Sequence, residues 1–140
     1  INDVQENIDS FLYKYNIFCS QNLIIYPRQN NVVPFYNEAS IVINLTDKKL
    51  AVETFGLTAL EAMSAGLPVI VPTEGGIAEM VTDGENGYKI DVQDLNKIVE
   101  YVHLLLSDQE LYNKLSNNAS AYSRNFNIDK MTESILSLFD

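Results

Sequence analysis

The sequence predicts an α/β protein with a doubly wound parallel sheet, helices on both faces of the sheet and a helical carboxy-terminal tail. Apolar runs of strand length alternate four times with helix-like segments between Leu23 and Leu106. Three of these runs lack alternating polar residues, which indicates strands buried on both faces. Such an order of strands and helices is typical of a parallel sheet covered by helices. Ligands of these sheets bind at the carboxyl ends of the strands.

The amino-terminal part should alternate helix and strand. Apolar residues between Val4 and Tyr15 recur at spacings of three and four, as on one helix face. A short apolar run is closed by Pro27, and Pro34 is tolerated in the first turn of a helix. The expected elements are a helix over 4–15, a strand at Leu23–Tyr26, a helix over Val32–Ala39, a strand at Ile41–Ile43 and a loop over Asn44–Thr54.

The rest of the chain continues this pattern and then becomes helical. Gly66 and Pro68 are stop signals for the helix that precedes them. Asp91 can cap one long helix, and Ser107 opens a capping box for the next. The expected elements are a helix over Gly56–Gly66, strands at Val69–Val71 and Tyr88–Ile90, a short helix over 75–81, a turn at Asp83–Gly87, and helices over Asp91–Leu106, from Ser107 and from Ile128.

Composition and charge restrict the function. The chain has 140 residues, of which 46% are hydrophobic and 20% charged, as in a folded single domain. Nine Lys and Arg against nineteen Asp and Glu give a net charge of −10, which excludes nucleic acid as a partner and disfavours anionic membranes. The sequence has neither a basic-then-apolar leader nor an apolar run of membrane-spanning length, so a cytoplasmic protein is expected.

The loop after the second strand carries the clearest candidate site. Gly56 lets a ligand approach the backbone, and the amides of Gly56, Leu57 and Thr58 should point out of a helix start, where an anion is favoured. Glu53 precedes this helix and Glu61 lies inside it, so the two carboxylates can accept hydroxyl hydrogen bonds on either side of a phosphate. The alternative is that Glu53 only complements the helix dipole and Glu61 is solvated.

A second glycine-containing loop follows the third strand. Gly75 and Gly76 precede a short helix, allow close backbone approach and offer amides to an anion. An ordinary tight turn is the alternative.

Four motifs occur in order in this region: Glu53-Thr-Phe-Gly-Leu-Thr-Ala-Leu-Glu61, Gly66-Leu-Pro68-Val, Gly75-Gly76-Ile-Ala-Glu79 and Asp83-Gly-Glu-Asn-Gly87. They resemble the E-x7-E, G-x-P-V, GG-x-x-E and D-G-x-N-G segments of the carboxy-terminal domain of family 4 (group 1) glycosyltransferases. That domain is a Rossmann-like half of the GT-B fold. The resemblance is dense over Ile41–Ile90 and looser over Asn22–Ala39 and the helical tail.

The resemblance implies a domain that binds a UDP- or GDP-linked sugar. Glu53 would hold donor-sugar hydroxyls and is the implied catalytic residue, and Glu61 would bind the ribose hydroxyls. Gly75 and Gly76 would shape the same cleft wall, and Arg28 would lie near the base. The amides that would hold sugar or diphosphate oxygens belong to Phe55, Gly56, Leu57 and Thr58.

The family transfers its sugar with retention at the anomeric carbon and needs no metal or other cofactor. The chain has no D-x-D pair that would chelate a metal, in agreement with this expectation.

The chain departs from the family pattern at its amino-terminal end. Residues 1–26 contain no counterpart of the Arg and the Lys-Gly that clamp the diphosphate, and the acceptor domain is missing. Residues 1–140 are therefore expected to be one partial donor-binding domain, inactive alone. The acceptor, a glycan or a lipid-linked sugar, would bind the missing domain, and peripheral association with the inner face of a membrane stays open.

Three other functions could be carried by this fold. A sugar-nucleotide epimerase would carry its catalytic acids in the missing half, while a glycosyl phosphorylase needs a lysine for pyridoxal phosphate that the chain does not offer. A non-catalytic nucleotide-sugar sensor or interaction module would also keep the fold, although the presence of both Glu53 and Glu61 weighs against a decayed site.

Overall fold

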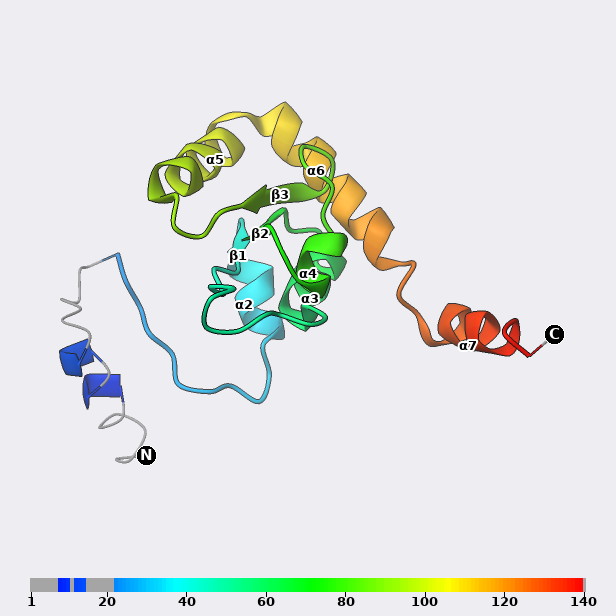
Figure 1. The fold of residues 1–140 in the computed structure, drawn as a ribbon. Coiled ribbons are helices and arrows are strands. Elements are labelled where there is room, and N and C mark those ends of the chain that lie inside the picture. Colours follow the sequence, from blue (N-terminus) through cyan, green and yellow to red (C-terminus); the bar gives the residue numbers. More distant parts are fainter. Residues whose placement is uncertain (1–7, 11, 15–21, 140) are drawn as a thin grey trace. The chain divides into compact units, whose positions relative to one another are not determined.

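The computed structural model describes residues 8–10, 12–14 and 22–139, and the chain divides into two units, Ile1–Pro34 and Phe35–Asp140 (Figure 1). In the first unit, residues 8–10 and 12–14 are helical, which agrees with the expected helix over 4–15. The other residues of that helix lie outside the described ones.

The strand expected at Leu23–Tyr26 is wrong. Residues 23–29 form neither helix nor strand, and the side chains of Leu23 and Ile24 are 42% and 70% exposed. A strand needs a neighbour that takes up its backbone hydrogen bonds. An apolar run of the right length does not supply that neighbour, and the sheet formed by the described residues has three strands instead of four.

The second unit is built on a parallel sheet. Val42 of the first strand lies opposite Val69 of the second, and Ile70 of the second lies opposite Tyr88 of the third. Because both pairs are parallel, the carboxyl ends of the three strands meet at one edge of the sheet. The strands, in their spatial order, are β1 (Val42–Ile43), β2 (Val69–Pro72) and β3 (Gly87–Ile90).

Helices connect the strands and follow them. The order of elements agrees with the sequence pattern from the second expected helix to the end of the chain. The helices are α2 (Val33–Glu38), α3 (Leu57–Ser64), α4 (Gly76–Glu79), α5 (Leu95–Ser107), α6 (Gln109–Ser123) and α7 (Ile128–Leu136).

The core lies on both faces of β2, all four residues of which are buried. Val69 and Val71 belong to one buried cluster with Met63 of α3, and this cluster also receives Tyr36 of α2. Ile70 belongs to the opposite cluster with Leu105 of α5. Figure 1 accordingly shows α5 on one side of the strands and α2, α3 and α4 on the other. The predicted doubly wound arrangement with helices on both faces is confirmed.

The amino-terminal caps of the long helices lie slightly further along the chain than expected. Asp94, not Asp91, caps α5 by accepting from the Lys97 amide at 3.0 Å. Asp108 caps α6 by accepting from the Leu111 amide at 2.9 Å, while Ser107 is still the last residue of α5. At each helix start more than one residue carries a side chain that can cap a helix, and the sequence pattern alone does not decide which one does.

Candidate functional site

Glu53 and the start of α3 form a compact turn beyond the carboxyl end of β1. Gly56 precedes α3 with φ 84° and ψ 47°, a left-handed conformation that glycine adopts without strain. Its amide donates to Oε1 of Glu53 at 3.2 Å, so this amide is not free, contrary to expectation. Leu57 and Thr58 occupy the first two positions of α3, where backbone amides have no acceptor within the helix. Two of the three expected anion-facing amides therefore remain available.

The second glycine-containing loop packs directly on this turn. A Cβ atom built on Gly76 would lie 1.9 Å from the carbonyl oxygen of Thr54, and one on Gly75 would lie 2.4 Å from that of Glu53. No side chain fits at either position without moving backbone. The two glycines thus serve the contact between the loops after β1 and β2, and the structure brings Glu53, Gly56, Gly75 and Gly76 together.

Glu61 lies on the exposed side of α3, beside α2. Its Oε2 accepts a hydrogen bond of 2.8 Å from the hydroxyl of Tyr36, which is half-buried. Burial raises the pKa of Tyr36 from 10.0 to about 12, with further contributions from the hydrogen bond to Glu61 and from its charge. The tyrosine therefore remains a protonated donor at neutral pH. Glu61 is not simply a solvated helix residue.

Three further polar residues contact these loops or α3, and none of them was among the predicted site residues. Tyr36 contacts Glu61; Asn44 donates to the hydroxyl of Thr58 at 3.3 Å; and Lys48 forms an ion pair with Glu74. The position of Asn44 directly after a strand was an available signal. The partners of Tyr36 and Lys48 are 25 and 26 residues away in sequence, so only the fold reveals them.

An open groove of about 510 Å³ lies beside these contacts. It follows β1 and the residues after it, and both polar and apolar residues line it. Its lining residues are Tyr36, Val42, Ile43, Asn44, Leu45, Thr46 and Thr58. Two of them, Tyr36 and Thr58, connect the groove to Glu61 and to the start of α3.

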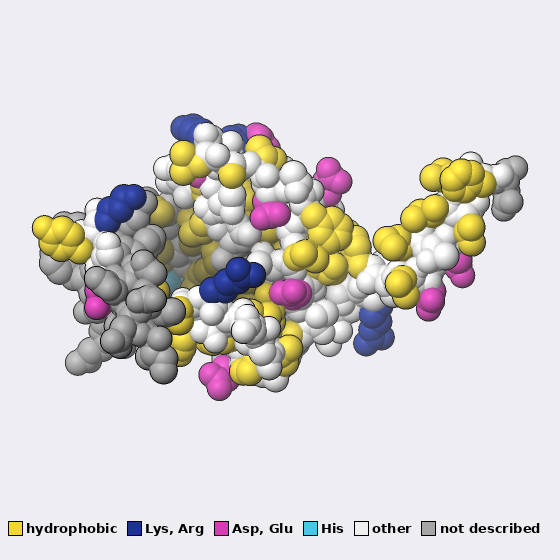
Figure 2. Space-filling view, turned by 90° about the horizontal axis from the view of Figure 1, so that it is seen from below, with side chains coloured by type: hydrophobic (Ala, Val, Ile, Leu, Met, Phe, Trp, Pro, Cys, Tyr) yellow, Lys and Arg dark blue, Asp and Glu magenta, His cyan; other side chains and the backbone are white. Residues whose placement is uncertain are grey.

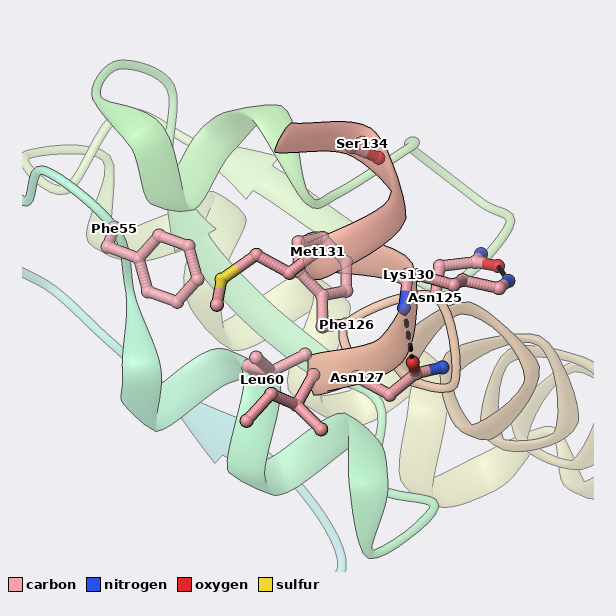
Figure 3. Close-up of a pocket in the computed structure, with 9 residues that line it drawn as sticks. Phe55, Leu60, Asn125, Phe126, Asn127, Lys130, Met131 and Ser134 are labelled. Carbon is pink, nitrogen blue, oxygen red and sulfur yellow. Dashed lines mark hydrogen bonds between the residues drawn. The ribbon is translucent and has the colours of Figure 1, made fainter. Parts of the chain in front are cut away.

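The side chain of Phe55 belongs to a different hollow. Its ring meets that of Phe126 edge-on, with centroids 6.3 Å apart, in a groove of about 600 Å³ between α3 and α7. Figure 3 shows these two rings and Met131 facing one another across this groove. Asn127 caps α7 here by accepting from the Lys130 amide at 2.9 Å. The side chain of Phe55 thus lies in this groove, and the predicted role of its amide stays a prediction.

Arg28 belongs to the first unit, and its expected place beside a nucleotide base stays a prediction. Among the described residues, no group of three or more His, Cys, Asp or Glu side chains could hold a metal ion. In that part of the chain, no helix is both long and apolar enough to cross a membrane.

Residues 5–122 match the family model described as glycosyl transferases group 1. Among curated proteins, the N-acetyl-α-D-glucosaminyl L-malate synthase of Bacillus anthracis is 31% identical over 104 residues. That match covers 74% of this chain but 26% of the synthase. An uncharacterised glycosyltransferase of Haemophilus influenzae is 30% identical over 130 residues, which make up 35% of its length. The chain thus spans about a third or less of these curated relatives.

Solved structures share the fold. The carboxy-terminal domain of LpcC, a group 1 glycosyl transferase family protein of Francisella tularensis, is 25% identical, with a TM-score of 0.66 over 89% of this chain and 62% of that one. HepE of Anabaena, solved in complex with UDP-glucose, is 19% identical, with a TM-score of 0.78 over 99% of this chain and 37% of HepE.

Proposed function

We propose that this chain is the donor-binding part of a sugar-transferring enzyme, since it belongs to the glycosyl transferases group 1 family. The enzyme would move a sugar from a UDP- or GDP-linked donor to an acceptor hydroxyl. The observation that carries the proposal is the pair of carboxylates around the start of α3, the half-buried Glu53 before the helix and the exposed Glu61 within it, together with the unpaired helix amides of Leu57 and Thr58. The UDP-glucose complex of HepE supports a nucleotide sugar as the ligand of this fold.

The start of α3 would hold the diphosphate. The amides of Leu57 and Thr58 lie at the positive end of the helix dipole, which favours an anion by about 0.3–1 kcal/mol at an exposed site. The fold fixes these two amides in place before the nucleotide sugar binds. They would therefore stabilise the charge that develops on the departing diphosphate without rearranging.

Glu53 would bind the donor sugar and is the residue that we place nearest the reaction. Its Oε1 is engaged by the Gly56 amide, and Oε2 has no hydrogen-bond partner among the described residues. Oε2 can therefore accept a hydrogen bond from a sugar hydroxyl, while the bond from Gly56 to Oε1 keeps the carboxylate in its orientation. We propose transfer with retention and without a metal, in which the leaving phosphate accepts the acceptor's proton and no side chain acts as a nucleophile.

Glu61 would accept hydrogen bonds from the ribose hydroxyls, and Arg28 would lie beside the nucleotide base. Gly75 and Gly76 would keep the wall of the cleft close to Glu53, as their contacts with the Glu53 and Thr54 carbonyls allow. An acceptor glycan or lipid-linked sugar would bind the part of the enzyme outside this chain.

Calorimetry on the full-length protein tests the donor site. UDP, GDP and their glucose conjugates would be titrated into the wild type and into Glu61→Ala. Hydrogen bonds to a charged group contribute about 1.5–3 kcal/mol, so Glu61→Ala should weaken binding of the preferred nucleotide roughly 10- to 100-fold. The Arg28→Ala variant would also be titrated with UDP and with GDP. If Arg28 contacts the base, this substitution should change the ratio of the two affinities.

Glu110→Ala is the matched control. Glu110 is an exposed glutamate in the first turn of α6, and its loss changes the net charge by the same amount. This variant should bind as the wild type does. Absence of binding to both nucleotides, or equal binding by wild type and Glu61→Ala, would contradict the proposal.

A further inference from the structure

Tyr36 is the only described side chain that donates a hydrogen bond to the Glu61 carboxylate. Its ring packs against the buried cluster that contains Met63 and Val69, and its hydroxyl reaches Oε2 of Glu61 at 2.8 Å. The ring is thus fixed by the core, and the hydroxyl is fixed with it. An exposed glutamate on a helix would otherwise exchange among several rotamers.

The contact leaves Glu61 able to bind a ligand. Each carboxylate oxygen can accept two hydrogen bonds, so Oε2 keeps one acceptor position and Oε1 keeps both. The hydroxyl of Tyr36 cannot release its proton to Glu61 at neutral pH, because burial and the adjacent carboxylate raise the pKa of Tyr36 to about 12. The bond therefore runs in one direction, from Tyr36 to a charged Glu61.

Tyr36 also lines the groove beside the start of α3. It lines the groove of about 510 Å³ together with Asn44 and Thr58, and Thr58 is in the first turn of α3. Tyr36 therefore borders both this groove and the Glu61 carboxylate.

We propose that Tyr36 is a positioning residue that holds the Glu61 carboxylate in the orientation that recognises the 2′,3′-diol of a nucleoside diphosphate. This inference rests on the proposed function, in which Glu61 binds ribose. It adds that Tyr36 and Glu61 together make the site select ribonucleotides over nucleotides without ribose hydroxyls.

The test compares two ligands on the full-length protein. UDP, GDP and their 2′,3′-dideoxy analogues would be titrated calorimetrically into the wild type, Tyr36→Phe, Glu61→Gln and the double variant. Loss of one hydrogen bond corresponds to a change of roughly 3- to 10-fold. Tyr36→Phe should weaken binding of the preferred ribonucleotide by this factor and leave binding of its dideoxy analogue unchanged. The double variant should bind no more weakly than Glu61→Gln alone, because Tyr36 acts through Glu61.

Tyr112→Phe controls for loss of a tyrosine hydroxyl elsewhere, since Tyr112 donates to the Ser40 carbonyl at 2.9 Å. It should bind both ligands as the wild type does. Equal weakening of both ligands by Tyr36→Phe would assign Tyr36 a packing role and overturn the inference, as would unchanged binding of both. A wild type that binds neither UDP nor GDP would instead overturn the proposed function.

Discussion

The two glutamates of the candidate site are each held by a single hydrogen bond from a group that the fold has already fixed. Gly56 donates its amide to one oxygen of Glu53, and Tyr36 donates its hydroxyl to one oxygen of Glu61. Each carboxylate thereby loses rotational freedom before a ligand arrives. A ligand then has less side-chain ordering to impose, which favours binding.

The pKa of Tyr36 predicts how stability changes at high pH. In the unfolded chain, Tyr36 ionises near pH 10, whereas in the folded chain its pKa is raised to about 12. Its contribution to folding is therefore fully present below pH 10 and is lost as the pH rises from 10 to about 12. We expect the free energy of unfolding of the wild type to fall across this interval more steeply than that of Tyr36→Phe.

Urea unfolding at several pH values from 9 to 12 measures this difference. Tyr112→Phe leaves Tyr36 and Glu61 unchanged, so it should retain the wild-type decline. A constant difference between wild type and Tyr36→Phe across the interval would show that ionisation of Tyr36 is not coupled to folding.

At the scale of elements, the loops after β1 and β2 are joined by direct backbone packing. The carbonyls of Glu53 and Thr54 approach Gly75 and Gly76 more closely than any side chain would permit. Lys48 adds an ion pair to Glu74 between the same loops. That pair is exposed and contributes little to stability, so the glycine contacts carry most of the connection.

Gly76→Ala should destabilise the chain by roughly 1–3 kcal/mol, because the new methyl group overlaps the Thr54 carbonyl and forces the loops apart. Gly84→Ala is a useful comparison, since a Cβ there meets nothing within 4 Å although φ is +71°. It should cost only the backbone strain of a non-glycine residue, about 1 kcal/mol. Thermal unfolding followed by circular dichroism compares the two. A smaller loss for Gly76→Ala than for Gly84→Ala would contradict the packing argument.

The sequence predicts the elements that local pattern determines and misses what depends on distant neighbours. The buried run at β2, the glycine and proline stops after α3 and the Gly75-Gly76 turn all appear as expected, because each signal lies within a few residues. The strand at Leu23–Tyr26 fails because pairing is not a property of the run itself. The contact of Tyr36 with Glu61 could not be predicted, since it requires α2 to pack beside α3.

At the scale of the whole molecule, the net charge of −10 agrees with a site that has few cations. Lys48, a lysine near the candidate cleft, is paired with Glu74. A diphosphate would therefore be bound mainly by helix amides in this chain.

Helix α7 carries a row of exposed apolar side chains, visible in Figure 2, which includes Ile128, Met131 and Ile135.

We expect the full-length protein, but not the 140-residue chain alone, to transfer sugar from its preferred donor, because the chain spans about a third or less of its curated relatives. NMR of the product should show that the anomeric configuration of the donor is retained, and EDTA should leave the rate unchanged. Inversion at the anomeric carbon would contradict the proposed mechanism, and loss of activity in EDTA would contradict metal independence. Conversion of the donor sugar without an acceptor would indicate an epimerase.

Glu53 contacts its two neighbours through different parts of the residue. Its main-chain carbonyl packs on Gly75, while its carboxylate accepts from the Gly56 amide. The amide oxygen of glutamine has the same shape and can accept the same hydrogen bond. Glu53→Gln therefore preserves both contacts but removes the negative charge and turns the second oxygen, the expected acceptor of a sugar hydroxyl, into an NH2 donor. The variant thus changes the part of Glu53 that would face the sugar and leaves its contacts with the surrounding loops in place.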